Sequence, residues 1–450
     1  MVPASLVKEN VGPYVVQFER FDREAGVVQP PWLRELRERA ISTFNELGFP
    51  TTRDEQWRFT NVAPIARAFF APASESGSLV TRDRLSAAGV EAPQATRLVI
   101  VNGRFDAALS DAAALPDGVT ALGLRDSLTA DPERLSQYLG RLAPFDQHAF
   151  RALNTAFLDD GVVVEIAAGR VIEEPIEILH VSAVDGVPGV AHPRALVIAG
   201  EQSQVRIVET YVSLDQERHF TNAVTEILVG AGAVVSHCCL ELENRQAYHL
   251  GGIHAHLQRS STFSSCVFVA GGEIVRNDVV AVLADEGADC TLNGVYLADG
   301  GTLVDNHTEI DHATPHCTSH ELYRGIVGGH ARGVFNGKIR VRPDAQKTDA
   351  KQTNKTLLLS DEAQINTKPE LEIFANDVKC THGATVGRLS DDQWFYLRAR
   401  GIGRDQARSM LVRAFAGDVV DAIGHPGIRA RVERLLTSRL AEMDGGGATS

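Results

Sequence analysis

The sequence QSQV (202–205) returns in related form as GAVV (232–235), STFS (261–264), GADC (287–290), HARG (330–333) and EAQI (362–365). Each segment is a turn of small or polar residues that leads into a run rich in Val, Ile, Thr and Phe. Successive segments are about 30, 29, 26, 43 and 32 residues apart. A loose period near 30 without intervening helices predicts a parallel β-helix, in which each coil buries its face by stacking on the next. A β-sandwich would also give frequent turns, but more than 200 continuous β residues exceed an ordinary sandwich.

Three zones follow from the change in periodicity. Residues 1–160 are mixed and partly helical, residues 161–388 form the predicted β core, and residues 389–450 return to helical spacing. The core opens on the clean strand pattern of residues 161–166. We therefore predict a mainly β fold, a parallel β-helix flanked by N-terminal and C-terminal helical domains that cap the solenoid.

Local signals place individual helices. Pro30 and Pro31 open an amphipathic stretch that ends at Gly48, and a second helical stretch is predicted over 131–157. Near the C-terminus, SDDQ (390–393) is a capping-box arrangement. Met410, Leu411, Ala414 and Phe415 recur there at helical spacing, and Phe395, Leu411 and Phe415 would form the apolar stripe that caps the solenoid. The tail GGGATS (445–450) is predicted to be disordered.

Composition excludes several classes of protein. The 450 residues carry a net charge of −14, which provides no global basic field for nucleic acid. No run of eighteen apolar residues and no secretory signal pattern occurs, so we expect a cytoplasmic protein without membrane association. The six cysteines form no CxxC pair, which favours buried thiols over a zinc ribbon or a disulfide framework.

Motifs for common catalytic chemistry are absent from the sequence. It contains no GxxxxGK[ST] phosphate loop, no GxSxG elbow and no HExxH motif. We therefore expect a protein that is not an enzyme. The alternative is a β-helix enzyme, either acyltransferase-like or polysaccharide-active, but no strict six-residue repeat persists from 161 to 387 and no carboxylate cluster marks a groove.

A histidine-rich group is one candidate for metal binding. It comprises His307, His312, His316, Cys317 and His320. In a single strand, His312, His316 and His320 would share one face, but Pro315 interrupts the run. We interpret the group as solvated or hydrogen-bonded histidines rather than as a metal site.

The segment 324–388 holds many polar residues inside the predicted core, such as Gln352 and Asn354, which can form ladders between stacked coils. Within it, Cys380 and His382 stand two residues apart, so in a strand their side chains lie on one side about 7 Å apart. Lys379 beside them would favour the thiolate. The spacing alone is also compatible with a buried cysteine next to a surface histidine.

Four stretches carry a closer resemblance. FNGKIRV (335–341), KTDAKQTNKTLLLS (347–360), TKPELEIFANDVKCTHGATVG (367–387) and FYLRARGI (395–402) resemble the SufB/SufD family of iron–sulfur cluster assembly proteins. The resemblance covers residues from about 160 to 440. It implies a right-handed parallel β-helix between helical domains and a non-catalytic role in the SUF iron–sulfur cluster assembly system.

The resemblance also implies partners and site residues. A family member of this kind pairs with the SufB paralogue, and each of the two binds one copy of the SufC ATPase through its C-terminal helices. Sulfur arrives from a cysteine desulfurase and its sulfur carrier, and a transient Fe–S cluster forms near the interface, with no cofactor held tightly by this chain. His382, a candidate metal ligand, and Cys380 would stand at this interface, while Arg404, Arg408 and Met410 would contact the ATPase.

Two departures separate this chain from the SufB branch of the family. The sequence reads His382-Gly383-Ala384 where SufB has a HEA-type sequence, and residues 1–237 contain no cysteine. Both features favour the SufD branch and speak against a self-sufficient cluster scaffold. A homodimer without the paralogue stays open.

Overall fold

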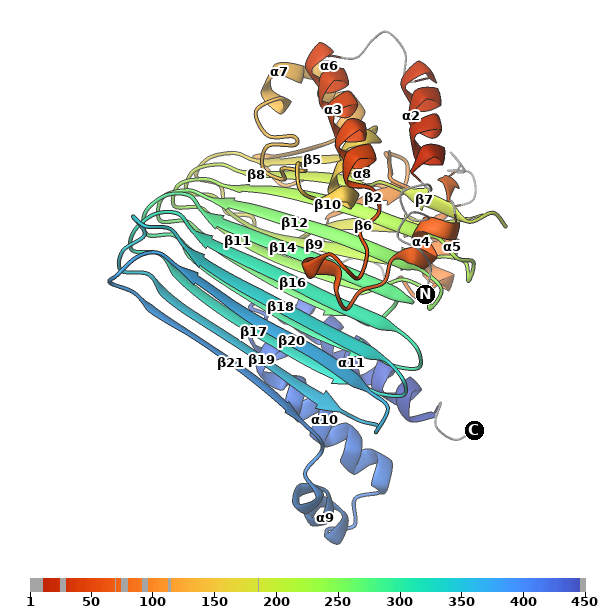
Figure 1. Cartoon of the computed structure of the whole chain (residues 1–450), viewed down its shortest axis with the longest axis vertical. Helices are drawn as coiled ribbons and strands as arrows, with labels where there is room; N and C mark the ends of the chain where they lie inside the picture. The colour runs from red at the N-terminus through yellow and green to blue at the C-terminus, as the bar shows by residue number, and fades with distance from the viewer. Residues whose placement is uncertain are drawn as a thin grey trace.

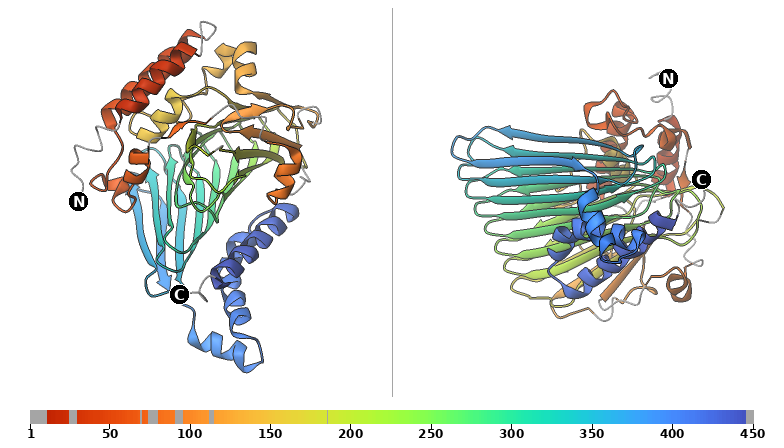
Figure 2. Two further views of the ribbon diagram at one scale, coloured as in Figure 1. Left: turned by 90° about the vertical axis from the view of Figure 1, so that its right-hand side faces the viewer. Right: turned by 90° about the horizontal axis from the view of Figure 1, so that it is seen from below.

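The structure is a computed structural model that describes residues 11–24, 30–68, 70–73, 80–90, 96–111, 115–184 and 186–445. It is a long two-sheet solenoid with helices on its outer faces (Figures 1 and 2). From residue 446 onward, the tail predicted to be disordered lies outside the described residues.

The N-terminal zone combines helices with short strands. Its elements are α2 (Gly12–Glu24), α3 (Pro31–Leu47), η1 (Glu55–Trp57), α4 (Ala63–Ala68), β1 (Ala71–Pro72), α5 (Arg82–Ala87), β2 (Thr96–Val101), β3 (Arg104–Asp106), β4 (Val119–Gly123), α6 (Leu124–Ala130), α7 (Pro132–Leu135) and α8 (Ala149–Ala156).

Seventeen further strands build the solenoid, and three helices follow them. The strands are β5 (Gly161–Ile166), β6 (Ile176–Ser182), β7 (Gly189–Ala191), β8 (Arg194–Ala199), β9 (Gln204–Ser213), β10 (Phe220–Val229), β11 (Val234–Leu242), β12 (Tyr248–Leu257), β13 (Thr262–Val269), β14 (Ile274–Leu283), β15 (Asp289–Ala298), β16 (Leu303–His312), β17 (Thr318–Val327), β18 (Arg332–Val341), β19 (Asp349–Leu358), β20 (Gln364–Ile373) and β21 (Lys379–Gly387). The helices are α9 (Asp391–Ala399), α10 (Arg404–Asp421) and α11 (Pro426–Gly445).

Two sheets face each other across the solenoid lumen. Sheet A runs in the order β20-β18-β16-β14-β12-β10-β8-β5-β4, and sheet B in the order β21-β19-β17-β15-β13-β11-β9-β6-β2-β3. Strand pairing within the coils is parallel, and only β4 with β5 and β2 with β3 are antiparallel among the described pairs. The predicted parallel β-helix between helical ends is therefore confirmed.

The predicted period is also confirmed, with one correction that concerns which sheet the last two repeated segments enter. Successive strands of sheet B begin at residues 204, 234, 262, 289, 318, 349 and 379, so a coil takes 27 to 31 residues and supplies two strands. The first four repeated segments lead into sheet B, but HARG and EAQI lead into β18 and β20 of sheet A. The long offset of about 43 residues is thus one and a half coils.

The lumen is filled by side chains that alternate inward along each strand. Two tyrosine rings pack directly against glycines on the neighbouring coil. A Cβ atom at Gly294 would lie 2.2 Å from the Tyr323 ring, and one at Gly325 would lie 2.3 Å from the Tyr296 ring. Because each ring occupies the space that a side chain would need, glycine is required at both positions.

The flanking helices cover opposite outer faces. Phe44 of α3 and Phe150 of α8 belong to the apolar cluster that includes Phe220 and Tyr248 of sheet A. On the other side, Val412 and Val419 of α10 pack with residues of sheet B such as Leu240 and Phe268 (Figure 2). Each helical zone therefore shields one sheet from water, as a solenoid requires.

The predicted helices are correct in part. The helix that starts at Pro31 is confirmed and ends at Gly48, whose φ is 68°. The stretch 131–157 is not one helix, because α7 and α8 are short and turns separate them.

The predicted C-terminal capping stripe is correct only in part. Phe415 packs against the apolar cluster of α10 and sheet B, but Phe395 is 75% exposed. The fully buried residues of α10 are Ala407, Val412, Ala416, Val419 and Val420. The Ser390 part of the predicted capping box is confirmed, since the Ser390 hydroxyl accepts a hydrogen bond from the Gln393 N–H.

Candidate functional site

The predicted pair of Cys380 and His382 lies on β21, the last strand of sheet B (Figure 1). Ala350 and Gln352 of β19 are their register partners, and both of those side chains are buried in the lumen. By strand alternation, Cys380 and His382 therefore lie on the lumen side of the terminal coil. His382 is exposed and Cys380 half-buried, because no further coil stacks on β21 within the described residues.

The surroundings of Cys380 contradict the expected thiolate. Burial and the nearby carboxylate of Asp349 raise the pKa of the Cys380 thiol. Lys379 precedes Cys380 on the strand, so its side chain lies on the opposite side and does not counter this effect. Cys380 is thus held as a neutral thiol until a ligand or partner changes its environment.

Polar side chains continue inward from His382 along the same ladder of the lumen. Gln352 donates a hydrogen bond from Nε2 to Oε2 of Glu321 on the next coil at 2.7 Å. The predicted polar ladder between stacked coils is therefore confirmed at Gln352. Asn354 instead donates across the lumen to the Thr367 hydroxyl of sheet A at 3.0 Å.

Further inward, histidines and carboxylates form a buried network that the sequence analysis missed. Glu209 accepts hydrogen bonds from His180 at 3.1 Å and from His237 at 3.0 Å. Burial alone would raise the pKa of Glu209, but these hydrogen bonds and charges outweigh it and lower the pKa. Glu209 is therefore ionised at neutral pH inside the lumen.

A second part of the network surrounds Glu243. This carboxylate contacts Nδ1 of His249 at 2.7 Å and Nε2 of His219 at 3.1 Å. Burial opposes protonation of His249, but the carboxylates of Glu241 and Glu243 raise its pKa to about 9. One signal existed in the sequence, since His237, Cys239 and Glu241 alternate along a strand that is otherwise apolar.

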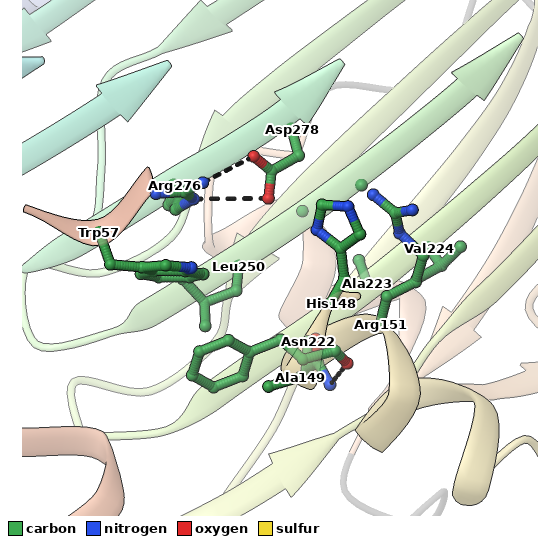
Figure 3. Close-up of a pocket in the computed structure, with 13 residues that line it drawn as sticks. Trp57, His148, Ala149, Arg151, Asn222, Ala223, Val224, Leu250, Arg276 and Asp278 are labelled. Atoms are coloured by element: carbon green, nitrogen blue, oxygen red, sulfur yellow. Dashed lines mark hydrogen bonds and ion pairs between the residues drawn. The ribbon is translucent and has the colours of Figure 1, made fainter. Parts of the chain in front are cut away.

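A cleft between the N-terminal zone and the outer face of sheet A was also missed. In Figure 3, the Arg276–Asp278 ion pair and Trp57 lie on one side, and His148 and Arg151 from the start of α8 lie on the other. An adjacent pocket, which shares His148, Arg151 and Asp278 with the one in Figure 3, has a volume of about 430 Å³. Burial and the charge of Arg151 lower the pKa of His148 to about 4, so His148 is neutral at neutral pH. The cleft combines fixed cations with neutral imidazoles.

The histidine-rich group is dispersed over different elements. His307 pairs with Asp305 at 3.0 Å on β16, and His312 at the end of β16 contacts the Ser319 hydroxyl at 2.9 Å. His316 lies in the following turn, and His320 is exposed on β17. The three histidines expected to share a strand face do not, because the turn around Pro315 separates two sheets. Throughout the described ranges, no group of three or more His, Cys, Asp or Glu side chains is arranged to hold a metal ion.

The candidate partner-binding residues lie at the C-terminal helices. Arg404 is exposed and its guanidinium lies 5.3 Å from the Trp394 ring centroid, Arg408 is half-buried, and Met410 is exposed. Phe395 and Tyr396 of α9 are exposed beside this region, at 75% and 56%. None of the helices in the described part of the chain has both the length and the apolarity to cross a lipid bilayer.

The fold and the exposed edge define a solenoid protein whose candidate site lies on its open terminal coil. Comparison with known proteins agrees with this class. Residues 181–415 match the family "SUF system FeS cluster assembly, SufBD core domain", and residues 13–178 match the "SufBD protein N-terminal region". The chain belongs to the SufB/SufD family of iron–sulfur cluster assembly proteins.

Individual relatives support the same assignment. An iron–sulfur cluster assembly SufBD family protein of Synechocystis is 32% identical, over 90% of both chains. The iron–sulfur cluster assembly protein SufD of Escherichia coli is 32% identical, over 87% of this chain and 90% of its own. SufD of Bacillus subtilis is 24% identical, over 92% of this chain and 95% of its own. The resemblance to SufD seen in the sequence is confirmed, and the chain is a SUF-system iron–sulfur assembly protein.

Proposed function

We propose that this chain is a non-catalytic subunit of a SUF assembly complex, which pairs edge to edge with a SufB-type paralogue. The observation that carries this proposal is the open end of the solenoid. β20 and β21, of ten and nine residues, form the terminal edges of sheets A and B. Natural proteins seldom leave long edge strands unpaired, because their free N–H and C=O groups pair with other chains.

The open coil would also bring the assembly chemistry to the interface. Iron and sulfur are substrates of the complex in this proposal, the sulfur being supplied by a cysteine desulfurase and its carrier. The imidazole of His382 would hold iron or the growing cluster transiently, and Cys380 would ligate it or fix the local geometry. No resident cofactor is required on this chain.

A SufC-type ATPase would dock on the C-terminal helices and supply ATP hydrolysis. The exposed side chains of Phe395, Tyr396 and Met410 provide apolar contact area at one end of the molecule. Arg404 and Arg408 would add charge at its rim. The buried side of α10 is occupied by sheet B, so docking would use the other side.

The pairing can be tested by the native mass of the chain co-expressed with the SufB-type and SufC-type proteins of its genome. We expect one copy of each paralogue and two ATPases by size exclusion with light scattering. The Lys379 N–H bonds to the carbonyl of Thr348, the residue before β19, so by strand alternation the N–H of Ala384 points away from β19. Ala384→Pro should therefore leave the fold intact and abolish the pairing, while Ala384→Ser keeps both. If the Ala384→Pro chain still pairs with the SufB-type paralogue, the proposal that pairing uses the β21 edge is wrong.

The role of the site can be tested in cells that depend on this SUF system. His382→Ala should reduce iron–sulfur enzyme activities at least tenfold, with normal levels of the assembled complex. His320→Ala, an exposed histidine on β17, is the matched control and should keep wild-type activities. Normal activities in His382→Ala would contradict the proposed role of His382.

A further inference from the structure

Two cysteines occupy directly opposite positions on neighbouring strands of sheet B. Cys238 of β11 is the register partner of Cys266 of β13. Their neighbours His237 and Ser265 line the lumen and hydrogen-bond to each other at 3.1 Å. The two thiols consequently lie on the outer face of the sheet, beneath the C-terminal helices.

The thiols open into a small cavity under the turn between α10 and α11. Its volume is about 110 Å³, and its lining includes both cysteines, Arg206, Ser236, Ser264 and His425. Cys238 is buried and Cys266 is half-buried. No carboxylate is among the described residues that line the cavity.

Strand spacing argues against a direct bond between the two sulfurs. Adjacent strands lie about 4.7–4.9 Å apart, and in-register residues of similar conformation keep that separation at Cβ. A disulfide requires a Cβ–Cβ distance of about 3.8 Å, so the sheet would have to contract by about 1 Å. A metal–thiolate bond of about 2.3 Å on each side spans a sulfur–sulfur distance of up to about 4.6 Å. The register therefore suits one thiophilic ion between the sulfurs.

The charges around the cavity favour a monovalent ion. Two thiolates with one monovalent cation form a unit of charge −1. Arg206, whose Nη1 donates a hydrogen bond to the Glu173 carbonyl at 3.0 Å, is the arginine among the described residues that line the cavity, so the local charge favours an anionic unit. Nδ1 of His425 accepts a hydrogen bond from the Ile428 N–H at 3.3 Å, so the neutral ring carries its proton on Nε2. His425 can thus donate to a thiolate but does not add a third ligand.

We propose that Cys238 and Cys266 bind one Cu(I) ion as a two-coordinate dithiolate. Among metals that prefer soft ligands, Cu(I) is the monovalent one and is selected by thiolates. One Cu(I) ion replaces two thiol protons, which pass to solvent, and no electron is transferred. The hydrogen bond to Cys238 and burial raise the pKa of Cys266. This site is independent of the assembly role proposed above.

The test is an anaerobic titration of the full-length chain with Cu(I) in competition with a chromophoric Cu(I) chelator. We expect one tight equivalent in the wild type and at least a 100-fold loss of affinity in Cys238→Ser and in Cys266→Ser. Cys239→Ser changes the adjacent residue, which faces the lumen, and should bind like the wild type. Cys380→Ser, at the open edge, should also bind like the wild type.

Two further measurements keep the proposal open to refutation if a serine variant is unstable. Thermal unfolding of each variant shows whether lost affinity reflects lost fold. X-ray absorption of the copper-loaded wild type should show linear two-coordinate Cu(I) with sulfur ligands only. Three- or four-coordinate copper, tight binding retained in both serine variants, or binding that follows Cys380 would each overturn the proposal.

Discussion

The lumen of this solenoid differs between its N-terminal and C-terminal coils. In the N-terminal coils, Glu209 and Glu243 are each bound by two histidines. In the C-terminal coils, Glu321 is equally buried but has the amide of Gln352 as its hydrogen-bond donor at 2.7 Å. Buried glutamates of this solenoid therefore have histidine partners in the N-terminal coils and an amide partner in the C-terminal coils.

Comparison of the two regions separates the effect of burial on a carboxyl pKa from the effect of its hydrogen-bond partners. Burial is the largest influence on all three carboxyls and raises their pKa values. For Glu209 and Glu243 the histidines reverse this effect and lower the pKa. For Glu321 the effect of burial prevails and the pKa rises to about 7. The N-terminal lumen is thus held by hydrogen bonds between histidines and ionised carboxylates, and the C-terminal lumen by a hydrogen bond between an amide and a carboxyl group.

The largest expected effect is the loss of an ionic centre in the N-terminal lumen. Glu209→Ala removes the acceptor of His180, His237 and Thr225 together, and it should lower the free energy of unfolding by about 3–5 kcal/mol. Chemical denaturation of the full chain measures this change. Glu372→Ala on β20 is the control, because its ion pair with Lys338 is half-exposed and should contribute less than about 1 kcal/mol. Equal losses in the two variants would refute the comparison.

In the C-terminal lumen, the contribution of the buried carboxyl group to stability should depend on pH in the opposite direction. The pKa of Glu321 in the folded chain, about 7, lies above the ordinary value, so its stabilising contribution is present at low pH and is lost as pH rises through 7. Glu321→Gln imitates the protonated form and should be about 1–3 kcal/mol more stable than the wild type at pH 8, with no gain below pH 4.

Glu209→Gln is the matched control for that measurement. The folded-state pKa of Glu209 is lowered, so its contribution is fully present above the ordinary carboxyl pKa and is lost as pH falls below that value toward the lowered folded-state pKa. This variant should be less stable than the wild type at pH 8 and approach it only below about pH 4. Unfolding curves from about pH 2 to 8 for both variants decide the point, and parallel pH dependence would disprove the assignment.

The repeat was predictable from sequence because each coil needs a turn at a similar place. The period appears in the spacing of QSQV, GAVV, STFS and GADC, which all lead into sheet B. The phase was not predictable at HARG and EAQI, since a turn followed by a strand looks the same in either sheet. The place of β2 in sheet B was also not predictable from local sequence, because β2 pairs with β6, about 80 residues further along the chain.

Some features of the candidate site could likewise be predicted from the sequence, and others could not. The alternation of Cys380 and His382 follows from the strand pattern, but their exposure depends on the absence of a stacked coil among the described residues beyond β21. The lumen network was missed because Glu209 and His237 meet only when two coils close on each other. The stripe on α10 was placed only in part because Leu411 and Val412 are equally apolar, and contact with sheet B selects which side chains are fully buried.

The smallest effect on stability is expected at His382, and it provides the most direct test of the comparison. His237 and His382 belong to one ladder of sheet B, which runs through Ser265, Leu292, Glu321 and Gln352. His237 is 3% exposed and bonds to Glu209 and Ser265, so His237→Ala should cost about 2 kcal/mol or more. His382 is exposed on an edge strand, so His382→Ala should change the free energy of unfolding by less than about 0.5 kcal/mol. A loss above about 1 kcal/mol in His382→Ala, measured by denaturation of the isolated chain, would show that the terminal coil depends on this imidazole for folding. In that case the loss of iron–sulfur enzyme activity expected for His382→Ala would come from a folding defect. If the stability is unchanged, the loss of activity must come from the missing imidazole at the open edge.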